Sequence, residues 1–250
     1  MDSLSFNQLI TQPFTLFGNL HFGVIATLII ILFLTFLLRK KSYIRYVYST
    51  ILIAQVIIFT FYHIIQKDYD LARFLPLHLC TVCAILAPYA LLSRSKNAEK
   101  LVIFWGFIPA LLAVLLPDMG ANDNIQSFRF WEFFVSHIII VASSFYLAIN
   151  HSKFFKINSK SILKPLKAFG LLIIYAFAIV YPLNYIFNWN YLYLMKRASN
   201  GMGFLPTGNL YLPSLMSLSL IVFVVTYLIY AGVYGAMNIS NKKSVEQKTI

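Results

Sequence analysis

The sequence predicts an all-α protein, a polytopic membrane helix bundle with seven transmembrane helices. Two observations favour this fold class. Of the 250 residues, 60% are hydrophobic and only 11% are charged, which is too few polar residues to cover the surface of a soluble domain. The apolar residues also gather into several runs of about 18 or more, the length that a helix needs to cross a bilayer.

Seven spans can be placed along the chain, each an apolar run bounded by polar or charged residues. Prolines within the later spans predict kinks rather than breaks, because neighbouring helices can satisfy the carbonyl that a proline frees. These prolines are Pro76, Pro88, Pro109 and Pro182. The predicted spans are Phe22–Leu38, Tyr46–Ile65, Phe74–Leu92, Leu101–Pro117, Phe130–Ile149, Ala168–Phe187 and Pro213–Met237.

Basic residues alternate from one side of the predicted bundle to the other. Most of the 20 Lys and Arg residues fall in the first, third and fifth loops and in the C-terminal tail. Cytoplasmic loops carry the excess of positive charge, so the N-terminus is predicted outside and the C-terminus in the cytoplasm. The net charge of +12 therefore reflects topology. Membrane lipids, with anionic headgroups at the cytoplasmic face, are the expected partners. Nucleic acid is excluded, and the sequence indicates no particular protein partner.

This topology divides the chain into three parts. Residues 1–21 form an extracytoplasmic N-terminal segment, residues 22–237 the seven-helix transmembrane domain, and residues 238–250 a basic cytoplasmic tail. Residues 1–20 contain no Lys or Arg and no apolar core before Phe22, so we expect no cleavable signal peptide. We expect no separate soluble domain.

Strongly polar residues within the spans gather in the outer half of the predicted bundle. His78, Cys80 and Cys83 lie in the first turns of the third span. Glu132 and His137 lie at a similar depth in the fifth span, which runs in the same direction. Because a charge at the bilayer centre costs about 2.5–3.5 kcal/mol, ionisable residues within a span are functional candidates by default.

This layer predicts a polar pocket open to the outer side, walled by the third and fifth spans and covered by the loop that begins at Asn188. The cytoplasmic halves of the spans are almost purely aliphatic and aromatic. Arg129 and Glu132 are three residues apart on one helix and are expected to pair. The candidate binding residues are Glu132, Asn190, Tyr191 and Asp118. Asp118 lies close enough to the interface to contact water or headgroups instead.

One hypothesis for the pocket is nucleophilic catalysis, which needs a nucleophile with a base within hydrogen-bonding reach. Cys80 is the candidate nucleophile, His137 the candidate base, and Thr81 the alternative nucleophile. Pro76 at the helix start leaves backbone N–H groups free near Cys80, which favours a thiolate. His78 is a further catalytic candidate, although in a regular helix it shares no face with Cys80.

Three other interpretations stay open. Cys80 and Cys83 form a C-x-x-C pair, which would suit thiol redox chemistry but is a weak signal outside a thioredoxin fold. The same pocket would suit non-enzymatic binding or transport of a small polar solute or lipid headgroup, through the histidines, Glu132 and Asn190. The polar layer would also suit helix packing alone. We expect no cofactor. We also expect no metal, because His78 and Cys80 point about 200° apart on a helix.

Four motifs then occur in order along the chain. They are LPLHLC (Leu75–Cys80), FWGFIPALLAVLLPD (Phe104–Asp118), FWEFFVSH (Phe130–His137) and NYLYL (Asn190–Leu194). From about Phe74 to Leu212 the chain thereby resembles the YwaF-like family of bacterial integral membrane proteins. That family is distantly similar to a eukaryotic transmembrane acyltransferase family that remodels ether phospholipids with a Cys–His pair, and to membrane hydrolases that use Thr and His.

The resemblance implies a multi-pass protein of the bacterial cell membrane that acts on lipid acyl esters, by transfer or by hydrolysis. His78 and His137 are the matching histidines. In the eukaryotic branch the nucleophilic cysteine immediately precedes the first histidine, a position that Leu77 holds here. By the resemblance, Cys80 or Thr81 would therefore supply the nucleophile.

Overall fold

The structure is a computed structural model that describes residues 14–67, 75–119, 123–151, 163–197 and 203–246, the last ten of these by their backbone alone. Within these ranges the chain is helical, with no strand. The elements are α2 (Asn19–Leu37), α3 (Tyr43–Gln66), α5 (Leu79–Ser93), α6 (Lys96–Leu115), α7 (Phe128–Asn150), α8 (Leu163–Tyr175), the π-helical turn η2 (Ala176–Val180), α9 (Tyr181–Phe187), the 3₁₀ turns η3 (Tyr191–Tyr193) and η4 (Gly208–Leu210), and α10 (Tyr211–Glu246).

Six helical segments of the described chain are long and apolar enough to cross a membrane. They are α2, α3, α6, α7, the continuous run Leu163–Phe187 made by α8, η2 and α9, and the apolar part of α10, Gly208–Ala236. Each of the six overlaps a predicted span, so an all-helical, multi-pass architecture is confirmed. The orientation of the two termini stays a prediction. The division into residues 1–21, 22–237 and 238–250 also stays a prediction, because both ends of the chain lie outside the described residues.

The third predicted span differs from the other six. Its first residue, Phe74, lies outside the described residues, and α5 begins only at Leu79 because the chain around Pro76 is not helical. The 15 residues of α5 span about 22 Å, less than the hydrocarbon core of about 30 Å. The helix of this third predicted span is therefore shorter than predicted, and a non-helical segment around Pro76 precedes it.

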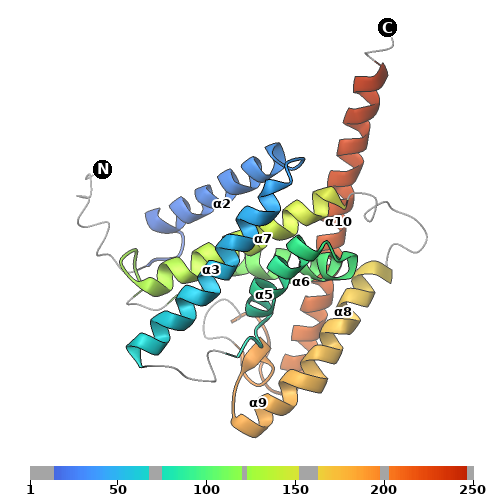
Figure 1. Cartoon of the computed structure of the whole chain (residues 1–250). Coiled ribbons are helices and arrows are strands. Elements are labelled where there is room, and N and C mark those ends of the chain that lie inside the picture. Colours follow the sequence, from blue (N-terminus) through green and yellow to red (C-terminus); the bar gives the residue numbers. More distant parts are fainter. Residues whose placement is uncertain (1–13, 68–74, 120–122, 152–162, 198–202, 247–250) are drawn as a thin grey trace.

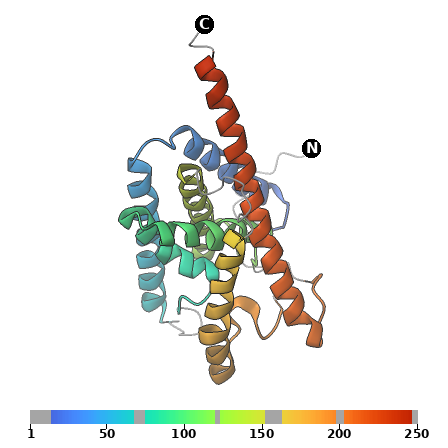
Figure 2. The ribbon, with the colours of Figure 1, turned by 90° about the vertical axis from the view of Figure 1, so that its right-hand side faces the viewer.

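Helices α6 and α7 form the centre of the bundle (Figure 1). They lie close together at Gly106, where a Cβ atom would lie 2.6 Å from Ser144 Oγ. Ser144 Oγ also donates a hydrogen bond to the Val102 carbonyl, 3.0 Å away. Helix α5 packs against both α3 and α6, and α8 lies beside α10, whose C-terminal turns extend beyond the other helices (Figure 2). The core is thus a slab of close-packed helices with α2 and α3 on one side and α8 and α10 on the other.

One charged cluster joins three helix ends. The Arg45 guanidinium on α3 lies 3.0 Å from Glu99 Oε1 on α6, and His151, which ends α7, contacts Glu99 Oε2. We call this the Arg45–Glu99–His151 cluster. It brings together the first, third and fifth loops, which the charge pattern assigns to one side. Glu99 is only 2% exposed, so a buried carboxylate lies just before the predicted span that begins at Leu101.

Candidate functional site

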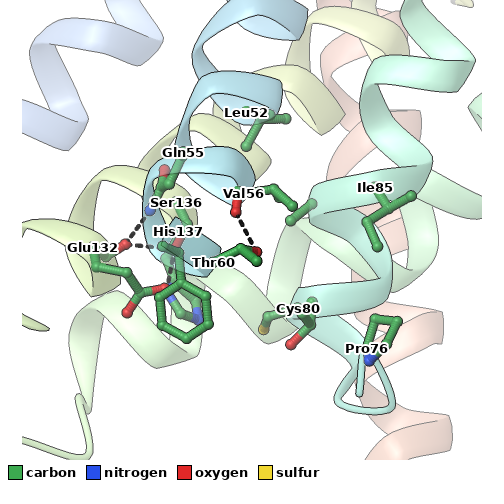
Figure 3. A pocket seen from close by; sticks show the side chains of 13 residues that line it. Leu52, Gln55, Val56, Thr60, Pro76, Cys80, Ile85, Glu132, Ser136 and His137 are labelled. Carbon is green, nitrogen blue, oxygen red and sulfur yellow. Dashed lines mark hydrogen bonds between the residues drawn. The ribbon is translucent and has the colours of Figure 1, made fainter. Parts of the chain in front are cut away.

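A pocket of about 160 Å³ lies between α3, α5 and α7 (Figure 3). Its walls come from three helices that are well separated in the sequence. Two of them, α5 and α7, are the predicted walls, whereas the third, α3, was not predicted. The loop after Asn188 contributes no lining residue, so the predicted cover is absent from the described part of the pocket.

Helix α3 lines the pocket with a single stripe. Leu52, Gln55, Val56, Phe59 and Thr60 recur at the spacing of one helical face. Other faces of the helix carry isoleucines and phenylalanine that are about half exposed, as suits a lipid-facing surface. This wall could have been predicted from the sequence, because Gln55 and Thr60 lie on one stripe of an otherwise apolar helix.

Helix α5 contributes Cys80, Thr81, Ala84 and Ile85 from its first two turns. In Figure 3 the Cys80 sulfur lies on the side of α5 that faces α7. Cys83 does not line the pocket: it is 0% exposed, and its sulfur lies 3.6 Å from the place that a Cβ on Gly106 of α6 would take. Both thiols are free. The two halves of the C-x-x-C motif therefore face different surroundings.

Helix α7 contributes Glu132, Ser136 and His137. The His137 Nδ1–H donates to the Phe133 carbonyl one turn earlier, at 2.6 Å. In a neutral imidazole this leaves Nε2 as the nitrogen with a free lone pair. Ser136 Oγ donates to the Glu132 carbonyl at 2.8 Å, and Gln55 Nε2 of α3 donates to the same carbonyl. The turn that carries His137 is thus fixed by side chains from two helices.

The pocket brings together four of the predicted site residues, Cys80, Thr81, Glu132 and His137. No hydrogen bond joins Cys80 or Thr81 to His137 among the described residues. His78 is not among the lining residues. It immediately precedes α5, where its ring packs against the rings of Tyr191 and Tyr193, with centroids 4.9 and 5.6 Å away.

The predicted binding residues Asn190 and Tyr191 belong to a turn that holds itself together. Asn190 Oδ1 accepts from the Met195 and Lys196 amides, and its Nδ2 donates to the Lys196 carbonyl. The side chain of Asn184, in the middle of α9, accepts from the amide and donates to the carbonyl of Tyr191, each at 2.9 Å. Burial raises the pKa of the neighbouring Tyr193 phenol. These asparagines therefore shape the turn and place Tyr191 beside His78, away from the pocket.

Asp118 also lies outside the pocket lining. Its carbonyl accepts a hydrogen bond from Arg129 Nη2 at 2.9 Å, and Arg129 Nε pairs with Asp123 Oδ2 at 3.1 Å. Arg129 is thus paired with a loop carboxylate, and its expected pairing with Glu132 stays a prediction. Across the described ranges, no group of three or more His, Cys, Asp or Glu side chains is arranged to hold a metal ion.

Comparison with known proteins gives one result. The TMEM164 family matches the chain over residues 15–230, which is most of its length and includes every wall of the pocket. Searches of curated proteins and of solved structures found no match.

Proposed function

The chain belongs to the TMEM164 family, and from this premise we propose that it is a multi-pass protein of the bacterial cell membrane that transfers or hydrolyses lipid acyl groups. In this proposal Cys80 is the nucleophile and His137 the general base. Its partners are membrane lipids, with anionic headgroups against the basic loops. The family supports the membrane location, and the pocket geometry supports the chemistry.

One observation carries the proposal: Cys80 and His137 line the same pocket from different helices. A general base must be oriented by a third group, and the Phe133 carbonyl has that role because it accepts the Nδ1–H at 2.6 Å. Nε2 is then the nitrogen available to a thiol. Catalytic hydrogen bonds are often long in a free enzyme and shorten when substrate binds, so we expect Cys80 and His137 to approach in the complex.

The proposed reaction has two steps. His137 Nε2 accepts the proton of the Cys80 thiol, and the sulfur attacks the ester carbonyl carbon of a lipid. The carbon–oxygen bond of the ester breaks, the released alcohol takes the proton from the imidazolium, and an acyl thioester remains on Cys80. The hydroxyl of a second lipid, or water, then attacks the thioester, which frees the thiol and completes transfer or hydrolysis.

The test is turnover of a phospholipid with a labelled acyl chain by the purified protein in lipid nanodiscs, measured by mass spectrometry. Cys80→Ala and His137→Gln should each lower turnover by about 10²–10⁴-fold without changing the temperature of unfolding. Turnover that survives Cys80→Ala but not Thr81→Val would transfer the role of nucleophile to Thr81. Turnover that survives both variants would refute nucleophilic catalysis from α5.

Cys83→Ala is the matched control, because it removes a thiol three residues away that faces Gly106 rather than the pocket. Acyl transfer predicts that this variant keeps its turnover. Thiol redox chemistry through Cys80 and Cys83 predicts no acyl turnover even in the wild type, because a dithiol exchanges electrons and transfers no acyl group. Non-enzymatic binding predicts labelled lipid bound but unchanged in every variant.

A further inference from the structure

The pocket is too small to enclose a lipid acyl chain. Its volume is about 160 Å³. A buried cavity of about 150 Å³ accommodates benzene, which has six heavy atoms. An ester group and a few neighbouring carbons therefore fill the pocket, and the rest of a long chain has to lie elsewhere.

The lining has a polar side and an apolar side. Glu132, Ser136 and His137 lie on the α7 side, whereas Ile85 lies on the opposite side, on α5 (Figure 3). Leu52 and Val56 of α3 complete the apolar side. An ester carbonyl fits the first environment and methylene groups fit the second. The pocket therefore defines a direction, in which the acyl chain runs from α7 towards Ile85, on the side where α5 lies beside α3.

The apolar side is continuous with the outer, apolar surface of the helices. Ile85 lines the pocket and is also 49% exposed. Tyr89, one turn further along α5, is exposed as well, and on α3 the exposed Ile53 and Ile57 follow Val56 around the helix. In a membrane protein such a surface contacts lipid chains. The pocket therefore opens on the side where acyl chains already lie.

We propose that the acyl chain of a membrane lipid enters the pocket laterally from the bilayer, between α3 and α5, and that only its ester end is enclosed. The inference rests on the proposed acyl-ester function and adds the route by which the substrate reaches the pocket. The substrate is a long-chain lipid ester that stays in the bilayer, and Ile85 forms the entrance. The length and unsaturation of the acyl chain far from its ester have little effect on turnover, because that part of the acyl chain remains in the bilayer.

The test uses two variants that make the same change at two exposed isoleucines. Ile85→Trp narrows the entrance, whereas Ile58→Trp is the matched control, because Ile58 is 56% exposed on another face of α3 and does not line the pocket. In proteoliposomes, Ile85→Trp should lower turnover of a palmitoyl phospholipid by at least about tenfold. Turnover of a water-soluble butyryl ester should fall by a smaller factor, because a short ester needs no path for a long chain out of the pocket, and Ile58→Trp should leave both activities unchanged.

Equal loss of butyryl and palmitoyl turnover in Ile85→Trp, or no loss of either, would overturn lateral entry while Cys80-dependent turnover upheld the proposed function. A second measurement is independent of catalysis. A phospholipid with a diazirine in its acyl chain should label Ala84 and Ser136, which line the pocket but are each only 8% exposed, in the wild type and in Cys80→Ala alike. Absence of labelling there would refute the route, even if the wild type turned over no ester and the proposed function failed.

Discussion

Two sets of polar side chains lie among the apolar helices of this protein, and they differ in how completely their atoms are hydrogen bonded. In the Arg45–Glu99–His151 cluster both carboxylate oxygens of Glu99 have partners. Arg45 also donates to the Leu91 carbonyl at 3.0 Å and lies over the ring of Tyr146. Every charged group of the cluster therefore contacts another polar or aromatic group, and its elements come from α3, α5, α6 and α7.

The pocket between α3, α5 and α7 is less complete. Gln55 Oε1 is a buried oxygen with no hydrogen-bond partner in the part of the chain that the structure describes. Cys80 and Thr81 donate no side-chain hydrogen bond to any described residue. Buried polar groups are nearly always satisfied in native proteins, so groups left open in a pocket indicate a place for a ligand. The comparison teaches that a structural cluster has complete hydrogen bonding, and that a buried oxygen left open in the wall of a pocket marks a candidate site, whereas Ser49 Oγ is open outside the pocket lining.

The largest effect on stability is expected at the complete cluster. Glu99→Ala leaves the Arg45 guanidinium without its carboxylate, and removing one partner of a buried ion pair costs about 3–5 kcal/mol. Thermal unfolding in detergent micelles should show the loss, whereas turnover per folded molecule should not change. The double variant Arg45→Met/Glu99→Leu should recover part of the stability, because both charges are then gone. A loss below about 1 kcal/mol in Glu99→Ala would contradict the structural role.

A smaller loss of stability is expected where α6 and α7 pack together, because these helices carry residues of the cluster and of the pocket. A Cβ at Gly106 would lie 2.6 Å from Ser144 Oγ and 3.1 Å from Ile140 Cγ2, so Gly106→Ala should destabilise the protein by about 1–3 kcal/mol. Because α6 carries Glu99 and α7 carries His137, this variant should impair stability and turnover together. Gly23→Ala on α2 is the control: nothing lies within 4 Å of its added Cβ, and it should unfold at the same or a higher temperature.

The boundaries of a helix could be predicted from the sequence where hydropathy alone determines them. The predicted span Phe130–Ile149 differs from α7 by two residues at one end and one at the other. The start of α5 could not be predicted in this way, because the segment from Leu75 to His78 is apolar yet not helical. Its conformation depends on Pro76 and on contacts with the distant turn at Tyr191, which hydropathy does not report.

The site could be predicted in part. Depth within the predicted spans grouped Cys80 with Glu132 and His137, and these residues do line one pocket. Depth does not fix which way a helix faces, so the same reasoning also placed His78 there. The wall made by α3 and the burial of Glu99 were missed for a related reason. Both depend on which helices become neighbours, and that is decided by packing across the whole bundle.

The smallest effect on stability is expected at the pocket itself, and it sharpens the comparison most. Gln55→Met removes an oxygen that has no described partner, and the Glu132 carbonyl keeps its bond from Ser136. The free energy of unfolding should therefore change by no more than about 1 kcal/mol, while turnover falls. Ser49→Ala is the matched control, because Ser49 Oγ on the same helix is likewise buried and has no partner among the described residues, but it lies outside the pocket lining. This control should change neither quantity. If Gln55→Met destabilised the protein as much as Glu99→Ala, the pocket would be a second structural cluster, and the open oxygen would no longer indicate a ligand.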